Sequence, residues 1–539
     1  MAIVDKISLV PRPTGPGRGL ICRGVAIIWC LAAFVVPAQA GVEAQAAPPW
    51  PTTPPAAICG NARLLNGPAT PPGGAVVVPA GSNAAFNFNR PGKTFWFAPG
   101  VHTLGTGLYD QIIARTGSTY VGAPGAVIDG QHRNLYAFTG DVRGVAVRYL
   151  TIRNFGRGLD NKDEGVVNHD AGPGWTVEHN TISGNDGAGV FIGSGNVVRF
   201  NCLKDNGQYG FSMYKAPING DSSIKNIVLD HNEIAGNNTD DWERREDGCG
   251  CTGGGKFWDV RGARVTANWV HGNRSVGLWA DTNNIDFLFE GNLIEANTDE
   301  GLWYEISYNA TIRGNSFRRN GWKKGHDNQG SPAPAIYLSE SGGEPRLASA
   351  VSGAAKIRIT GNFFEDNFSG VSIYENANRF CNSNGNTSTE YCTPLVLPTV
   401  IAEPHNTTYP NPINAKHPCY TRIGQAPYRT DCRWHAAAIE VSGNEFRFDR
   451  RVVPCFGSYC GVQALMATGD DNIRWSPYTV DGVQHDVMFR NGNRFFGNRY
   501  IGDWRFATAW GGDDDILTFA QWQAAPFGQD AGSTAKKAP

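Results

Sequence analysis

One lysine and two carboxylates occupy comparable places in short segments of the chain that share one pattern. Each lies in a five-residue stretch that starts at a glycine: Lys256 is the third residue of its stretch, and Asp281 and Glu305 are the fifth residues of theirs. If these stretches are strands of neighbouring coils, about 4.8 Å apart, the two carboxylates are close neighbours. Two carboxylates at that distance cannot both ionise at low cost, so we expect one to hold a proton at an unusually high pH, or a cation to lie between them. A protonated and an ionised carboxylate are the pair that glycoside hydrolysis requires.

Large aromatic side chains occupy the same positions in these and the neighbouring stretches. Along a strand the second and fourth residues should point inward and the third and fifth outward, which places these rings on the outer face. Rings stack on the apolar faces of sugars while acids bond hydroxyls or transfer protons, so the face is a candidate glycan site. The alternative is that neighbouring insertions cover the rings and bury them. The candidate sugar-binding residues are Trp258, Trp279, Trp303, Tyr337, Tyr214 and Tyr374.

A repeated phrase precedes many of these strands: two asparagines five residues apart, with an apolar residue two places after the first. The closest copies start 21 to 24 residues apart (Asn180 to Asn201, Asn268 to Asn292), which is one turn of a solenoid. Asparagines at the same place in successive coils are expected to form a hydrogen-bonded ladder that satisfies the backbone groups of the turns. The copies start at Asn180, Asn201, Asn232, Asn268, Asn292, Asn315, Asn362 and Asn493.

The order of strand, asparagine turn, glycine and strand resembles the right-handed parallel β-helix proteins of the pectate-lyase-like superfamily. The resemblance is clearest over 145–375 and weaker over 437–504, and the segments 94–103 and 120–130 look like the first coils of that family. It implies an all-β fold, a right-handed parallel β-helix (solenoid) with loop insertions and a short C-terminal helical cap. Repeat motifs support a fold, whereas a reaction has to be argued from the site.

The resemblance also implies a rival chemistry, because lyases of this superfamily often use a Lys or Arg base, with calcium held by acidic residues against a uronate. Lys256 lies one coil from Asp281 and is long enough to reach the same substrate. A lysine base needs a lowered pKa, which flanking carboxylates oppose, so we expect Lys256 to be an electrostatic partner of the substrate instead. Hydrolysis by Asp281 and Glu305, without a required cofactor or metal, is therefore favoured.

Two alternatives to a glycoside hydrolase stay open. One is a polysaccharide lyase that performs β-elimination on a uronate-containing polymer, with Ca²⁺ as a cofactor. The other is a non-catalytic glycan-binding surface protein that uses the same aromatic residues. In each case the partner is a polysaccharide.

The N-terminus has the features of an export signal. Basic residues up to Arg23 precede an apolar run, 24–36, and Ala38-Gln-Ala40 is a small-x-small cleavage site. The apolar run of ~13 residues is shorter than the roughly 20 that a membrane span needs. We therefore expect a secreted or periplasmic protein that is free of the membrane after cleavage.

The rest of the chain is predicted to form one domain. A signal peptide (1–40) and a Pro/Ala-rich linker (41–58) precede a β-helix (59–515), and a cap and tail (516–539) follow it. Three insertions interrupt the period, and insertions in solenoids collect on one face, often the binding face. They span about 238–254, 321–334 and 376–435.

Composition and charge agree with this organisation. Among 539 residues, 41% are hydrophobic and 67 are glycine, which is typical of a β-rich, turn-rich globular protein. The formal net charge of -2 lacks the basic field of a nucleic-acid-binding protein, so we expect no nucleic-acid partner. We expect a monomer.

The cysteines favour disulfides. Of 12 cysteines, Cys22 and Cys30 lie in the predicted signal peptide, and the ten that remain are an even number in an exported chain. Three local pairs would staple loops, although the sequence does not determine the connectivity. They are Cys381–Cys392, Cys419–Cys432 and Cys455–Cys460.

Overall fold

The computed structural model describes residues 49–157, 168–169, 171–213, 223–246, 252–327, 332–377, 379, 421–422, 424–426, 428–469, 478–509 and 515–538. The predicted signal peptide, the candidate Tyr214 and most of the third predicted insertion lie outside these residues. All described residues belong to one compact unit, Pro48–Pro539. None of its described helices has both the length and the hydropathy needed to cross a bilayer.

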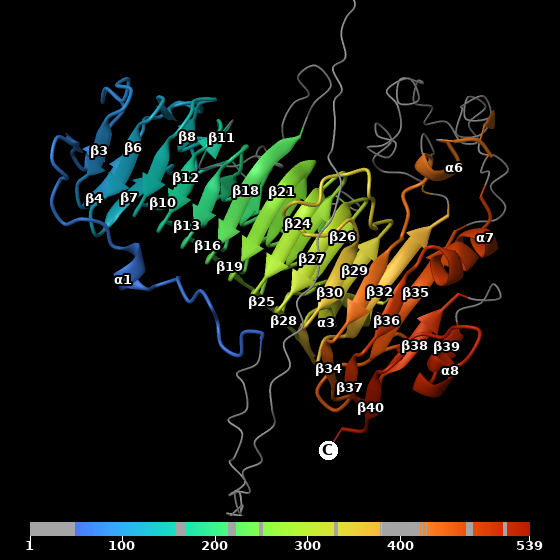
Figure 1. Ribbon diagram of the computed structural model, residues 1–539. Coiled ribbons are helices and arrows are strands. Elements are labelled where there is room, and N and C mark those ends of the chain that lie inside the picture. Colours follow the sequence, from blue (N-terminus) through green and yellow to red (C-terminus); the bar gives the residue numbers. More distant parts are fainter. Residues whose placement is uncertain are drawn as a thin grey trace, which may run out of the picture. The chain divides into compact units, whose positions relative to one another are not determined.

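Three long β-sheets run along a stack of coils, and strands that follow one another in a sheet come from successive coils (Figure 1). A coil passes from the first sheet to the second and then to the third, as β12, β13 and β14 do at Thr176–Glu178, Thr181–Ser183 and Val190–Phe191. The all-β solenoid that the repeat predicts is therefore confirmed. It follows that residues 21 or more positions apart in sequence face each other across one strand spacing.

The first sheet has 13 strands and the second has 14, all paired in parallel in the described residues. The first sheet contains Val76–Val78 (β1), Thr94–Phe97 (β3), Thr119–Gly122 (β6), Ala146–Arg148 (β9), β12, Val197–Arg199 (β15), Ile224–Asp230 (β18), Val260–Thr266 (β21), Ile285–Glu290 (β24), Tyr308–Arg313 (β27), Ile357–Thr360 (β30), Ile439–Ser442 (β33) and Arg494–Phe496 (β36). The second contains Gly81–Ser82 (β2), Gly100–Thr103 (β4), Ala126–Asp129 (β7), Thr151–Arg153 (β10), β13, Cys202–Lys204 (β16), Glu233–Ala235 (β19), Trp269–His271 (β22), Leu293–Glu295 (β25), Ser316–Arg318 (β28), Phe363–Glu365 (β31), Glu445–Phe448 (β34), Arg499–Gly502 (β37) and Thr534–Lys536 (β40).

The third sheet has ten described strands and carries the candidate site. It contains β14, Phe211–Ser212 (β17), Gly255–Trp258 (β20), Leu278–Asp281 (β23), Leu302–Glu305 (β26), Pro334–Ser339 (β29), Ser369–Asn376 (β32), Val462–Thr468 (β35), Arg505–Thr508 (β38) and Asp515–Leu517 (β39). Its last pair, β38 with β39, is antiparallel. In the earlier coils a separate three-stranded sheet takes its place, with Ile112–Ile113 (β5), Phe138–Thr139 (β8) and Asn168–His169 (β11).

Short helices lie in the segments that connect or precede the strands of the coils. Two of them lie in the first and second predicted insertions, and one lies where the C-terminal cap is expected. The described helices are Ala62–Leu65 (α1), Trp242–Arg245 (α2), Trp322–Asp327 (α3), Tyr428–Asp431 (α6), Val480–His485 (α7) and Phe519–Gln523 (α8), with a π-helical turn at Asp486–Arg490.

Two rows of buried asparagines line the turns, as the repeat predicts. In each row the side-chain Nδ2 of one asparagine donates to the Oδ1 of the next, over 2.9–3.1 Å. A buried, satisfied hydrogen bond contributes about 0.5–1.5 kcal/mol net, so the rows stabilise the stack substantially. The first row, between the first and second sheets, is Asn180, Asn201, Asn232, Asn268, Asn292, Asn315, Asn362, Asn444 and Asn498. The second, between the second and third sheets, is Asn185, Asn206, Asn237, Asn273, Asn297, Asn320 and Asn367.

The predicted copy that starts at Asn493 is wrong in register. Asn498 belongs to the first row, where it accepts from Asn444, rather than to the second. The coil of Asn444 has Asp449 where a second asparagine would stand, so the second row ends at Asn367 in the described residues. The predicted copy therefore combines Asn493, which donates to the Ala436 carbonyl, with Asn498, which belongs to the first row.

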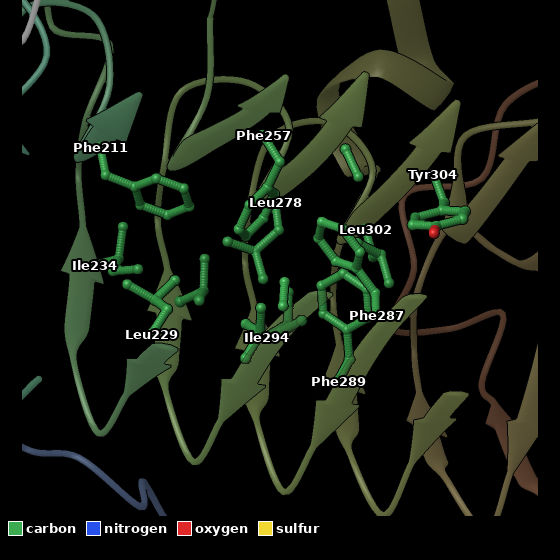
Figure 2. Packing of buried hydrophobic residues seen from close by; sticks show 14 of the residues in the cluster. Phe211, Leu229, Ile234, Phe257, Leu278, Phe287, Phe289, Ile294, Leu302 and Tyr304 are labelled. Carbon is green, nitrogen blue, oxygen red and sulfur yellow. The ribbon is translucent and has the colours of Figure 1, made fainter. Parts of the chain in front are cut away.

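The inward-pointing residues form one continuous apolar core (Figure 2). In its middle the ring of Phe257 makes edge contacts with those of Phe211 and Phe287, at centroid distances of 5.0 and 5.3 Å. Such edge-to-face pairs add about 0.5–1.5 kcal/mol to the hydrophobic contribution of the rings. This core fixes the backbone of the third sheet from inside, so its outer side chains project from a rigid support.

The N-terminal segment 49–66 lies against the outer surface of the second sheet. The ring of Trp50 stacks on that of Phe363 in β31, with centroids 5.4 Å apart, and the Ser316 hydroxyl in β28 donates to the Pro51 carbonyl. Farther along, the Cys59 backbone N–H donates to the Glu233 carboxylate in β19 over 2.7 Å. The part of the predicted linker that is described is thus held on the sheet.

The disulfides confirm one predicted local pair and add a distant one. Cys455–Cys460 is formed, and Cys59 is bonded to Cys202 in β16. Cys432 is also in a disulfide. The proposed partners Cys381, Cys392 and Cys419 lie outside the described residues.

The predicted C-terminal cap is confirmed at α8. Thr518 caps this helix with Gln521 in a capping box, and Trp522 is fully buried against the rings of Phe495 and Phe506. The predicted tail also contains β40, which extends the second sheet beyond β37. The last coil is therefore covered by a helix and the sheet gains one more strand, which leaves a shorter exposed edge.

Candidate active site on the third sheet

The two outward columns of the third sheet are in the predicted register. Lys256 pairs with Trp279 across β20 and β23, Trp279 with Trp303 in β26, and Trp303 with Tyr337 in β29. In the second column Trp258 pairs with Asp281, and Glu305 pairs with Ser339, which pairs with Tyr374 in β32. Along β20 the burial alternates as expected, with Phe257 inside and its neighbours half-buried.

The aromatic side chains form a continuous row across four coils. The rings of Trp279 and Trp303 stack with centroids 4.4 Å apart and planes 3° apart, and Tyr337 follows Trp303 at 5.2 Å. Tyr374 follows Tyr337 at 5.8 Å. Trp303, Tyr337 and Tyr374 are half-buried, whereas Trp279 is only 6% exposed. Trp279, one of the predicted sugar-binding residues, is thus packed inside the row, whereas the other three rings keep part of their surface exposed.

Lys256 is held by one of the two candidate carboxylates. Its Nζ lies 2.9 Å from Asp281 Oδ2 and 4.4 Å from the ring centroid of Trp279. The other oxygen of Asp281 accepts from the Thr282 hydroxyl over 2.8 Å. The lysine is therefore placed as a cation, stabilised by a carboxylate and by an aromatic face.

Glu305 is the buried member of the predicted carboxylate pair. It is 3% exposed, its Oε1 lies 2.6 Å from Arg379 Nη1, and its Oε2 accepts from Trp279 Nε1 over 2.9 Å. Burial raises the pKa of Glu305 to about 7; Arg379 opposes this rise, and the carboxylates of Asp281 and Glu340 add to it. The sequence analysis expected one carboxylate of the pair to hold its proton to a higher pH because of the other; for Glu305 the first cause is burial, and the charge of Asp281 adds to it.

Two residues of this centre, Arg379 and Glu340, were missed by the sequence analysis. Arg379 Nη1 also lies 2.9 Å from Glu340 Oε2, so it bridges two buried carboxylates. Glu340 directly follows β29, and Arg379 follows β32 at the start of the third predicted insertion. The sequence places both close to the outward columns and gives no other signal for them: Glu340 is one residue after Ser339, and Arg379 is three residues after the end of β32.

A second ion pair flanks the opposite end of the same strands. Lys324 of α3 lies 2.9 Å from the fully buried Glu300 and 5.0 Å from the ring centroid of Trp303. Burial raises the pKa of Glu300, and Lys324 counteracts it. Burial alone would lower the pKa of Lys324, but Glu300 and Asp299 outweigh it and raise it. The second predicted insertion thereby brings a cation to the aromatic row.

This face can transfer protons and hold a planar apolar surface. Glu305 can give or take a proton near neutral pH, Lys256 and Arg379 supply positive charge, and the half-buried rings offer contact area. Over the described residues, no cluster of three or more His, Cys, Asp or Glu side chains has an arrangement that could hold a metal ion.

Comparison with known proteins identifies the architecture. Residues 164–348 match a family model described as a right-handed β-helix region. No curated protein sequence matches the chain. Among solved structures, the A-module of the mannuronan C-5 epimerase AlgE4 from Azotobacter vinelandii is similar, with 15% identity over 57% of this chain and 83% of that one and a TM-score of 0.41.

Two further structures are similar at the same distance. The periplasmic alginate epimerase AlgG has 11% identity over 80% of this chain and 85% of its own, with a TM-score of 0.32. XylC, solved in complex with xylose, has 12% identity over 58% and 52%, with a TM-score of 0.30. At this distance no activity transfers from these proteins. By its repeat, its three stacked sheets and the match over residues 164–348, the chain has the architecture of a right-handed parallel β-helix.

Proposed function

We propose that the protein is a carbohydrate-active enzyme that hydrolyses a polysaccharide with Glu305 and Asp281 as its acid/base pair. The observation that carries this proposal is Glu305: a buried carboxyl whose pKa is raised to about 7, beside a second carboxylate, under a row of aromatic rings. A carboxyl that stays protonated near neutral pH is what a glycosidase needs in order to protonate the leaving oxygen.

In this mechanism the protonated Glu305 donates its proton to the glycosidic oxygen as the bond from that oxygen to the sugar carbon breaks. Both oxygens accept from donors in the structure, Oε2 from Trp279 Nε1 and Oε1 from Arg379, so a proton on Oε1 requires Arg379 to draw back from Glu305. Asp281 then serves as the base or nucleophile on the sugar carbon. Lys256, 2.9 Å from Asp281, stabilises the negative charge there and bonds a polar group of the substrate.

The contacts of Lys256 favour hydrolysis over elimination. A lysine that removes a proton from a uronate needs its amine nitrogen free to face that proton, but the Nζ of Lys256 is engaged by Asp281 and lies over the Trp279 ring. Elimination with Lys256 as the base would need a substrate or a cation to take Asp281 away from it first.

One observation favours a second candidate function, glycan binding without turnover. Each oxygen of the two carboxylates already has a partner: Lys256 and Thr282 for Asp281, and Arg379 and Trp279 for Glu305. Carboxylates satisfied in this way also suit a rigid surface on which Trp303, Tyr337 and Tyr374 hold a sugar chain.

Product analysis distinguishes these functions. The mature protein is incubated with neutral and uronate-containing polysaccharides in H₂¹⁸O, and the products are weighed by mass spectrometry. Hydrolysis yields fragments that carry one added ¹⁸O-labelled water, and elimination yields fragments lighter by one water. Intact polymer that is bound supports the glycan-binding protein, and a parallel reaction in D₂O shows whether intact polymer has exchanged a carbon-bound hydrogen, which would contradict both hydrolysis and simple binding.

Two variants connect the products to the site. Asp281→Asn and Glu305→Gln should each abolish the hydrolytic fragments while glycan affinity falls less than threefold. Glu290→Gln, on β24 away from the third sheet and paired with Arg313, is the matched control and should behave as wild type. Unchanged turnover in Glu305→Gln would refute the assignment.

A further inference from the structure

A single guanidinium serves two buried carboxylates at the candidate site. Arg379 Nη1 lies 2.6 Å from Glu305 Oε1 and 2.9 Å from Glu340 Oε2. The Arg379 side chain is 12% exposed, and those of Glu305 and Glu340 are 4% and 0% exposed. Two buried carboxylates that share one cation are more stable when one of them carries a proton, because water is not there to solvate the second negative charge.

Glu340 is the better fixed of the two carboxylates. Its Oε1 accepts the backbone N–H of Asn376 over 2.7 Å, and its Oε2 accepts the hydroxyl of Ser339 as well as Arg379. Its backbone has a φ of 47°, in the left-handed region, directly after the end of β29. Glu340 is thus held by three donors, whereas Glu305 has two, Arg379 and Trp279.

The other groups around Glu305 leave the proton on Glu305. Facing it are Arg379 beyond β32, Glu340 beyond β29, Asp281 on β23 and Tyr337 on β29, with Lys256 of β20 on the far side of Asp281. Three carboxylates therefore stand against two cations. Of the three, Asp281 is paired with Lys256 and Glu340 accepts from three donors, while Glu305 is buried and its pKa is raised, so Glu305 is the carboxylate that takes up the proton.

We propose that Arg379 and Glu340 are positioning residues that decide where the proton of Glu305 sits. When Glu305 is protonated on Oε1, Arg379 moves from Glu305 toward Glu340 and the proton on Oε1 is available to the substrate. When Glu305 has lost the proton, Arg379 bridges both carboxylates, as in the structure. This inference rests on the proposed acid role of Glu305, although its charge arrangement is testable without any substrate.

In the proposed hydrolysis, Glu305 supplies one proton and water supplies the hydroxide and the second proton. The Oε1–H bond of Glu305 breaks and its proton goes to the glycosidic oxygen, which also keeps the electron pair of the broken bond to the sugar carbon. A water molecule supplies hydroxide to that carbon and its remaining proton to the basic carboxylate. Arg379 compensates the new charge on Glu305 by returning to it, so no co-reactant other than water is needed.

The test is a pair of substitutions with opposite expected effects. Arg379→Gln removes the cation that opposes the proton and should raise the pKa of Glu305 by about one unit or more. Glu340→Gln removes a negative neighbour and leaves Arg379 to Glu305 alone, so it should lower that pKa by a similar amount. Arg379→Lys retains the charge and should restore most of the wild-type value.

The pKa is read directly by infrared titration of the protonated carboxyl band, which is identified as the band missing in Glu305→Gln. Where turnover is measurable, the pH profile of kcat/KM should move with the band in the same direction. Because the infrared titration needs no substrate, an inactive wild type would refute the proposed function and still leave this inference tested.

Controls separate positioning from folding. Circular dichroism and the melting temperature of each variant show that the coils are intact, and Arg313→Gln, which breaks an exposed pair with Glu290, should leave the band unchanged. Shifts of the same sign in Arg379→Gln and Glu340→Gln, or no shift in either folded variant, would overturn the proposal. If Arg379→Gln does not fold, the comparison of Arg379→Lys with Glu340→Gln tests the proposal instead. Equal pKa values of Glu305 in these two variants would overturn it.

Discussion

Glu305 and Glu375 are two buried glutamates near the ends of strands in the same sheet, and each has an arginine. Glu305 ends β26 beside Arg379, and Glu375 in β32 lies 2.5 Å from Arg433. Burial raises the pKa of both glutamates, and the arginine opposes the rise in both. By burial and by pKa direction alone, the two centres are equivalent.

They differ in how the arginine is shared and in what lies next to it. Arg433 makes a close pair with Glu375, which also accepts the Ala436 N–H over 3.0 Å, while Asp486 is farther away, at 3.7 Å. Arg379 forms ion pairs with two carboxylates, Glu305 at 2.6 Å and Glu340 at 2.9 Å, beside half-buried aromatic rings. A raised pKa therefore does not by itself mark a functional carboxylate; a shared counter-charge next to an accessible surface is the stronger indication.

The largest expected difference between the two centres is in turnover. Glu305→Gln should lower kcat by about 10²–10⁴-fold, because it removes the transferable proton. Glu375→Gln should leave kcat per folded molecule unchanged, since Glu375 is packed under Arg433 and does not border the aromatic row. Both are measured as initial rates, normalised to the folded fraction from circular dichroism. Equal losses of rate in the two variants would remove the distinction.

The second difference should be in stability. Arg433→Ala leaves Glu375 as a buried carboxylate without its cation and should lower the free energy of unfolding by about 3–5 kcal/mol. Arg379→Ala should cost less, because Glu305 takes up a proton readily near pH 7 and Glu340 keeps two other donors. Denaturant unfolding at pH 7 measures both. A larger loss for Arg379→Ala would show that Arg379 is mainly a structural tie.

The pH dependence of stability sharpens the comparison further. The pKa of Glu305 is raised from its ordinary 4.5 to about 7 in the folded protein, so the folded state binds this proton more tightly than the unfolded state. Its contribution to stability is complete below pH 4.5 and is lost as the pH rises to about 7, with a slope of at most about 1.4 kcal/mol per pH unit. Glu305→Gln should flatten this part of the curve, and an unchanged slope in that variant would contradict the raised pKa.

The smallest expected effect concerns the rings beside each centre. Trp303→Ala should weaken glycan binding by about 0.5–1.5 kcal/mol, the contribution of one stacked aromatic pair. Tyr478→Ala removes the ring that lies 4.7 Å from the Arg433 guanidinium and should leave glycan affinity unchanged. Affinity electrophoresis or calorimetry with the same glycan measures both variants. A loss of affinity in Tyr478→Ala would place sugar contacts at the Glu375 centre too.

The sequence was sufficient for whatever repeats from coil to coil. A buried asparagine that bonds its equivalents in the coils above and below recurs in most coils, so its spacing is visible in the chain and gives the period. The period in turn gives the register, which placed Lys256 beside Trp279 and Glu305 beside Ser339 correctly. The coil of Asn444 has Asp449 in place of its second asparagine and was therefore not recognised as a copy. For this reason Asn498 was assigned to the wrong row.

What does not repeat could not be predicted. Arg379 follows the last strand before a long insertion, and the period says nothing of where such a segment places its side chains. Glu340 comes directly after the last residue of β29, where the backbone has a positive φ that the strand alternation does not predict, and it pairs there with Arg379. The bond from Cys59 to Cys202 joins a residue upstream of the repeat to one inside it, at a separation of 143 residues.

The segment 49–66 has a consequence for the order of assembly. The surfaces that receive Trp50, Cys59 and the Pro51 carbonyl belong to strands β31, β16 and β28, all of which come later in the chain. Contacts between distant parts of a chain form after local ones, because the intervening loop has to close first. This segment is therefore made before the surfaces that receive it and docks after they have formed, and Cys59 cannot form its disulfide until Cys202 has been made. The fraction of chains in which the Cys59 thiol has been converted to a disulfide would thus report how far the central coils have formed.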